Sequence, residues 1–156
     1  MKENQGEEIL DLLLSKDAEV SLPTSTGATA LHFATSKDNL DIAKKLIAHK
    51  ASTRVKDKRG QLALHRAAAL GSVPLTRLLL ANKSPINATD MDGMTALHHA
   101  ISEGHADVAV ELLRAGAESD KRDKYERLAI QCAPDAKVRR FVEAAAERDG
   151  FELTRQ

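Results

Sequence analysis

Aromatic residues are scarce in this chain. They make up 3% of the 156 residues, with no tryptophan and a single tyrosine. A platform that stacks single-stranded bases needs several aromatic side chains, so we expect no nucleic-acid partner of that kind. The formal net charge is zero, from 23 basic and 23 acidic residues, which also argues against general attraction to nucleic acid or to an acidic membrane.

Cysteine and long apolar runs are equally rare. Cys132 is the one cysteine, which excludes an internal disulfide and is typical of a reducing compartment. The first eight residues lack the apolar core of a signal peptide, and no apolar run approaches the roughly 18 residues that a membrane span needs. We therefore expect a cytoplasmic or nuclear protein that does not enter a membrane.

One pattern recurs along the sequence with a period of 33 residues. Its clearest copy is Asp90 to Ala100, which reads DMDGMTALHHA. Earlier copies begin at Thr24 and Asp57, and a weaker copy begins at Asp123. Each copy combines a turn with the start of an apolar helix. A fixed period of this length predicts a solenoid in which similar units stack and share one continuous core.

Each unit is predicted to contain two helices. Thr29 and Thr95 are placed to cap first helices, and Asp135 is placed to cap the last helix. Along that last helix the apolar residues have the i, i+3, i+4, i+7 spacing of a core-facing stripe: Val138, Phe141, Val142 and Ala145. Residues 7–15 have helical spacing as well and match a second helix without its first.

These features predict an all-α solenoid. We expect a partial amino-terminal repeat at 1–23, repeats at 24–56, 57–89 and 90–122, a degenerate capping repeat at 123–150, and a loose tail at 151–156.

The repeated motifs resemble a known family. Thr-Ala-Leu-His-Phe-Ala at 29–34 and Thr-Ala-Leu-His-His-Ala at 95–100 are similar to the ankyrin-repeat signature T-P-L-H-x-A, with alanine in place of its proline. The resemblance covers about residues 7–150. It implies stacked helix-turn-helix units with β-turn fingers, in which the turn tips and first helices bind protein partners.

A narrower resemblance concerns the segments 29–37, 41–47 and 63–69, which look like those of gankyrin-type assembly chaperones of the proteasome regulatory particle. It implies that the partner is the carboxy-terminal domain of a proteasomal ATPase subunit, bound through charge complementarity. The alternative is a general ankyrin adaptor that binds a kinase, a transcription factor or a membrane-linked protein.

Catalysis and metal binding are not expected. His32, His65 and His98 recur at the period of the repeat, which indicates a structural role. His99 and His105 are not accompanied by a cysteine or carboxylate cluster at ligand spacing. Cys132 has no evident base beside it in the pattern. We expect no enzyme activity, no metal and no cofactor.

The candidate binding residues are those that vary between turn tips and first helices. Basic side chains on the second and fourth tips favour an acidic partner, and methionine and tyrosine are typical of adaptable interfaces. Arginine holds a carboxylate in a two-point geometry. We expect a monomer that binds through ten residues: Lys58, Arg59, Arg66, Met91, Asp92, Met94, His99, Lys124, Tyr125 and Arg127.

Overall fold

The computed structural model describes residues 20–156. The helix expected at 7–15, and almost all of the partial repeat expected at 1–23, lie outside the described residues. Within 20–156 the secondary structure consists of seven α-helices and one short 3-10 helix, with no strand, which confirms the predicted all-α class.

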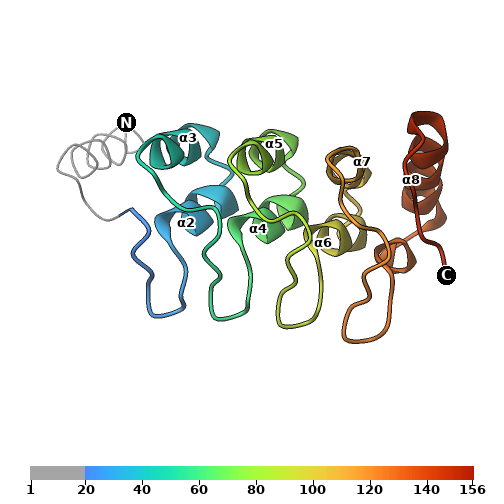
Figure 1. Ribbon diagram of the computed structural model, residues 1–156, viewed down its shortest axis with the longest axis horizontal. Helices are drawn as coiled ribbons and strands as arrows, with labels where there is room; N and C mark the ends of the chain where they lie inside the picture. Colours follow the sequence, from blue (N-terminus) through green and yellow to red (C-terminus); the bar gives the residue numbers. More distant parts are fainter. Residues whose placement is uncertain (1–19) are drawn as a thin grey trace.

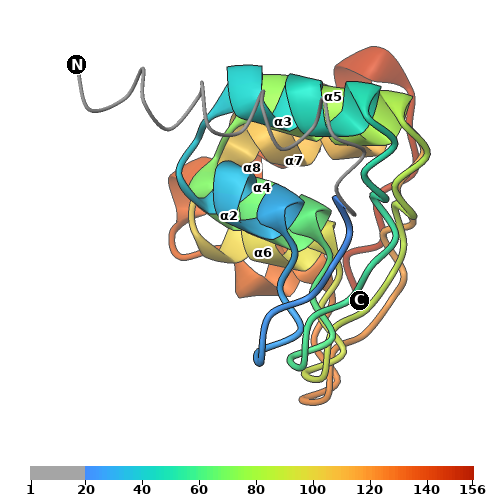
Figure 2. The ribbon, with the colours of Figure 1, turned by 90° about the vertical axis from the view of Figure 1, so that its left-hand side faces the viewer.

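The helices come in antiparallel pairs joined by long turns. Figure 1 shows α2 to α7 side by side in two rows, with α8 standing across the end of the stack and the long turns projecting below the lower row as fingers. Seen along the stack, the fingers superpose and leave the helices at an angle (Figure 2). The elements in chain order are α2 (Ala30–Ser36), α3 (Leu40–Ala48), α4 (Ala63–Leu70), α5 (Val73–Ala81), α6 (Ala96–Ser102), α7 (Ala106–Arg114), η1 (Ala129–Cys132) and α8 (Ala136–Asp149).

Side-chain caps explain where several helices begin. The side chains of Asn39, Ser72 and Asp135 accept hydrogen bonds from the third residue of α3, α5 and α8, respectively. Pro74 lies in the first turn of α5, where its missing N–H costs nothing. Gly71 ends α4 with a φ of 84°, a left-handed conformation that glycine adopts most easily.

The histidines at the 33-residue period tie each first helix to a later part of the chain, which for His32 and His98 is the next repeat. The Nδ1 atoms of His32, His65 and His98 accept hydrogen bonds from the backbone N–H three residues earlier, at 3.0, 3.0 and 3.3 Å. Their Nε2 atoms lie 2.9–3.0 Å from backbone oxygens further along the chain, those of Gln61, Ala88 and Arg127. The predicted structural role of these histidines is confirmed. Gln131, at the same position of the last repeat, accepts only the local bond, from the N–H of Leu128.

The fingers stack through their backbones. The N–H of Lys58, Met91 and Lys124 donates to a carbonyl of the preceding finger at 2.9–3.0 Å. The contact is so close that a Cβ at Gly60 would lie 3.1 Å from the nitrogen of Met91. Glycine is therefore required both by its positive φ of 76° and by the next finger. Glu126 occupies this turn position in the fourth finger, beyond which the described residues form no further finger.

Leucines from both helices of each pair form a single core. Those of the second helices, Leu46, Leu79 and Leu112, are at most 1% exposed. The first helices contribute Leu31, Leu64, Leu97 and Ile130, also at most 1% exposed. The core is continuous from repeat to repeat.

Two expectations for the carboxy-terminal part are wrong. Phe141 does not face the core with Val142; its side chain is 53% exposed. Residues 151–156 are not a loose tail, because Phe151 and Leu153 pack against the core and the N–H of Thr154 donates to Ser119 Oγ at 2.9 Å. The apolar residues of this segment account for the difference, since burying them removes apolar surface from water.

Candidate partner-binding surface

A buried aspartate organises each of the last three fingers. Oδ1 of Asp57 accepts the backbone N–H groups of Arg59 and Gln61, both at 2.9 Å. Asp90 and Asp123 make the same pair of bonds two and four residues further along their own turns, at 2.9–3.0 Å. These carboxylates fix the turn backbone and hence the directions of the tip side chains.

The second oxygen of each aspartate is bound by a basic side chain. Arg66 Nη2 lies 2.9 Å from Asp57, His99 Nε2 lies 2.8 Å from Asp90, and Arg127 Nη2 lies 2.8 Å from Asp123. Burial disfavours the charged form of the aspartates, but the hydrogen bonds outweigh it and hold the pKa of all three below its usual value. These three basic side chains are therefore already bound to carboxylates of the protein itself.

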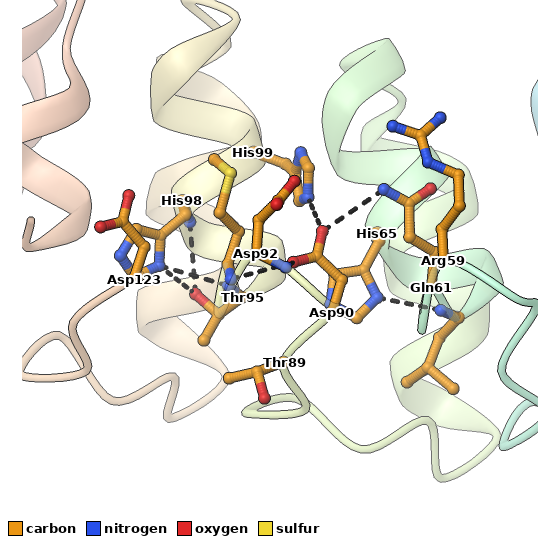
Figure 3. Close-up of polar contacts among 12 residues, drawn as sticks. Arg59, Gln61, His65, Thr89, Asp90, Asp92, Thr95, His98, His99 and Asp123 are labelled. Atoms are coloured by element: carbon orange, nitrogen blue, oxygen red, sulfur yellow. Dashed lines mark hydrogen bonds and ion pairs between the residues drawn. The ribbon is translucent and has the colours of Figure 1, made fainter. Parts of the chain in front are cut away.

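The Asp90 cluster is the most extensive of the three. Figure 3 shows the carboxylate between the His99 ring and the Gln61 side-chain amide, which lies 3.4 Å away. The ring of His65 meets that of His99 edge to face, with centroids 5.7 Å apart. Burial, followed by repulsion from His99, lowers the pKa of His65 to about 4. This network belongs to α4, α6 and the third finger together.

The second and third tips differ from each other in charge. Lys58 and Arg59 are exposed, and neither side chain makes a hydrogen bond or ion pair with any described residue. Met91 is 74% exposed on the neighbouring tip, whereas Met94 is half-buried beside Asp90. Asp92 is paired with Lys124 of the fourth finger. The tips therefore present two unpaired cations next to an exposed thioether.

Tyr125 is held between two cations on the fourth tip. Lys124 Nζ and Arg127 Cζ each lie 5.1 Å from the centre of its ring, within the range of a cation–π interaction. Tyr125 nevertheless stays 64% exposed. Such an arrangement fixes an aromatic side chain at the surface, which lowers the entropy that it loses on binding a partner.

Two exposed apolar residues of the first helices were not among the predicted binding residues. Phe33 on α2 is 48% exposed and Leu70 on α4 is 41% exposed. A hollow of about 400 Å³ lies next to Leu70 and is lined by Ser36, Gln61, His65, Arg66, Ala69, Leu70 and Glu103. Phe33 occupies the same position in its repeat as Arg66 and His99 do in theirs. The variability of this position between repeats was the sequence signal that could have marked Phe33 as a candidate binding residue.

Comparison with protein families places these repeats. A family model described as "Ankyrin repeats (3 copies)" matches residues 2–90 and again residues 37–123. Together the two matches span most of the chain. The chain is an ankyrin-repeat protein. No curated protein matches it, so the narrower likeness to proteasome assembly chaperones has no relative to support it. Ankyrin repeats are protein-binding scaffolds, and we name the tips of fingers two to four together with the adjoining sides of α4 and α6 the finger surface.

The rest of the ankyrin array offers little chemistry. Among residues 20–156 no three histidine, cysteine, aspartate or glutamate side chains are grouped so as to hold a metal ion. Burial raises the pKa of the Cys132 thiol, which makes it a poor nucleophile. No helix in the described part of the chain is both long and apolar enough to cross a membrane. Nothing in these residues indicates an enzymatic activity.

Proposed function

We propose that this ankyrin-repeat protein is a non-catalytic scaffold whose finger surface binds a protein with an acidic surface. The observation that carries the proposal is the pair Lys58 and Arg59, exposed side by side without a carboxylate partner among the described residues. Arg66, Lys124 and Arg127 are already paired with carboxylates, and Lys56 and Arg122 donate to backbone carbonyls. An acidic partner would therefore gain the most binding free energy from ion pairs with the second tip.

The neighbouring tips supply contact area for such a partner. Met91 is flexible and adapts to irregular surfaces, and Tyr125 offers a ring already fixed by its two cations. The buried aspartates hold these tips in place, so the backbone of the tips loses little conformational entropy when a partner binds. Charged pairs at the rim would speed association, and burial of the methionine and tyrosine would slow dissociation.

For the identity of the partner we propose the carboxy-terminal domain of a proteasomal ATPase subunit, whose assembly into the regulatory particle the protein would assist as a chaperone. The motifs at 29–37, 41–47 and 63–69 support this choice. The alternative is an adaptor for a kinase, a transcription factor or another signalling protein. Both alternatives use the same finger surface.

Affinity purification from cell extract tests the partner and the surface together. We expect recovery of proteasomal base ATPases with the unaltered protein, and loss of that recovery with Lys58→Glu combined with Arg59→Glu. Arg127 is unsuitable for charge reversal, because it neutralises the buried Asp123 and its loss would disturb the turn itself. The matched control is Lys44→Glu with Arg155→Glu, which changes the net charge equally on exposed positions away from the fingers.

The results separate the alternatives. Recovery of a different acidic protein, lost in the same double variant, would replace the ATPase with an adaptor role. Recovery that is equal in the tip variant and in the control would exclude the second tip as the interface. Binding of the unaltered protein should also weaken as the salt concentration rises, because exposed charges are screened.

A further inference from the structure

A second exposed surface lies on α8, away from the fingers. Five residues spaced by three, one, three and four positions share one side of this helix, and all of them are exposed. We name it the α8 face, and its residues are Lys137, Arg140, Phe141, Ala144 and Arg148. The buried residues Val142, Ala145 and Ala146 lie on the opposite side of the helix.

The α8 face has an excess of positive charge. It contains three cations and no acidic residue. Within residues 20–156, the side chains of Lys137 and Arg140 make neither a hydrogen bond nor an ion pair. Arg148, the third cation, is paired with Asp149 at the end of the helix. The other acids of this helix are engaged with residues outside the face, Glu143 with Arg139 and Glu147 with Arg155, so the unpaired charge comes from Lys137 and Arg140. The face therefore attracts an acidic ligand.

Phe141 occupies a position that is polar in the preceding repeat. The repeat register aligns Val138 with Val108, and the same step of 30 residues aligns Phe141 with Glu111. In α7 that position is polar, and Glu111 accepts two hydrogen bonds from Arg77, at 2.8 and 3.1 Å. In α8 a large aromatic ring stands there instead and is 53% exposed.

The surface is hollowed on both sides of this ring. One hollow, of about 310 Å³, lies toward the start of α8 and is lined by Gly104, Ala106 and Val138, with Asp135 and Lys137 at its rim. The other, of about 240 Å³, lies toward α5 and α7; its apolar lining is Val73 and Val110, and its rim is charged, with Arg77, Arg114 and Arg148 beside Asp107 and Glu111. Phe141 borders both. Each hollow has room for an apolar side chain beside the aromatic ring.

We propose that the α8 face binds an acidic protein segment that inserts an apolar side chain on each side of Phe141. The cations select the acidic segment by charge complementarity, and the hollows select its apolar residues. A bilayer surface fits less well, because a flat layer of lipid headgroups would leave both hollows unfilled. The site is independent of the finger surface, so the protein could hold two partners at once.

A synthetic peptide tests this directly. The probe is a short peptide of glutamate and alanine that carries two leucines four positions apart, titrated into the ¹⁵N-labelled full chain. We expect chemical-shift changes in α8 and in residues 104–110, without changes at the finger tips. Phe141→Ser should weaken binding about tenfold. The same peptide with alanine in place of both leucines should bind as weakly to the unaltered protein.

A matched pair of arginines serves as the control. Arg140→Ala removes a cation from the α8 face, whereas Arg139→Ala removes one from the neighbouring position, which is paired with Glu143. We expect only the first to weaken peptide binding. Equal effects of both, or shifts confined to the fingers, would overturn the proposal. Sedimentation with vesicles of phosphatidylcholine and phosphatidylserine that depends on Phe141, without binding of the peptide, would assign the face to a membrane instead.

Discussion

The second residue after each of α3, α5 and α7 adopts a left-handed backbone conformation. Its φ is 69° at Lys50, 66° at Lys83 and 96° at Gly116. A side chain makes this conformation costly, whereas glycine adopts it readily. We expect Lys83→Gly to raise the free energy of unfolding by about 0.5 kcal/mol, as measured by chemical denaturation. Lys83→Ala is the control, since alanine retains a Cβ; an equal gain there would point to charge rather than backbone conformation.

Arg66 and Arg59 look alike in sequence but have different surroundings. Arg66→Ala would leave Asp57, whose side chain is 3% exposed, without its charged partner. We expect it to lower the free energy of unfolding by about 1–3 kcal/mol. Arg59→Ala should change it by less than about 0.5 kcal/mol. Thermal or urea unfolding of the two variants compares them, and similar losses would contradict the assignment of Arg66 to Asp57.

The sequence predicted which residues vary at the tips but not which of them are used internally. That Asp57 opens a turn follows from its place before the glycine. That its second oxygen meets Arg66 depends on the angle between a finger and a first helix, which no local pattern specifies. The available signal was a repeated aspartate with a basic residue nine positions later, at Arg66 and His99. Thr24 in the first finger is followed at this distance by Phe33, which has no carboxylate to neutralise.

At the scale of the helices, the linking histidines should make stability depend on pH. Burial, as the largest effect, lowers the pKa of His32, His65 and His98, for His65 to about 4. The unfolded chain takes up protons near pH 6.5 that the folded chain accepts only at lower pH. The free energy of unfolding should therefore fall as pH decreases from about 6.5 to about 4, by roughly 3 kcal/mol from His65 alone.

Glutamine at this position provides the test. Gln131 in the fourth repeat already shows that glutamine can make the local bond. We expect His65→Gln to reduce the loss of stability between pH 6.5 and 4, measured by urea denaturation across that range. If the free energy of unfolding of His65→Gln depends on pH as it does in the unaltered protein, then His65 does not cause that pH dependence.

The last helix shows where two sequence rules conflict. The helical stripe rule assigned Phe141 to the core, because apolar residues stand at i, i+3, i+4 and i+7. The repeat register instead aligns this position with Glu111, a polar and partly buried residue that is bound to Arg77. The structure follows the register, since α8 must pack on α7 through the positions that α7 uses toward its own neighbours. In a solenoid the contacts between units decide which face is buried.

At the scale of the whole molecule, stability depends on contacts between stacked units. Leu112 is fully buried in the core that α7 shares with its neighbours. Leu112→Ala should lower the free energy of unfolding by about 2–5 kcal/mol, as measured by chemical denaturation. Leu22→Ala is the control, because Leu22 is 67% exposed and its truncation should cost less than about 0.5 kcal/mol. An unchanged midpoint for Leu112→Ala would contradict the position of α7 in the stack.

The overall architecture was accessible from the sequence because one period governs the whole chain. Once the position of one turn is known, the others follow, together with their helices and leucines. The packing of residues 151–156 against Ser119 was not accessible in this way, since it occurs once and has no echo at 33 residues. The same holds for the hollows around Phe141, which exist only where a shortened repeat meets a regular one.

The turn of the fourth finger affects whether two copies of this chain can stack end to end. At the first three turns the next finger approaches so closely that a Cβ would lie 3.0–3.1 Å from its backbone nitrogen. Glu126 carries that Cβ, on a backbone with a φ of 63°. A finger belonging to another chain cannot add here with the same spacing. Stacked modules risk growing into filaments through their open ends, and a single glutamate in place of a glycine disfavours that growth at this edge, because an added finger would have to shift by a few tenths of an ångström.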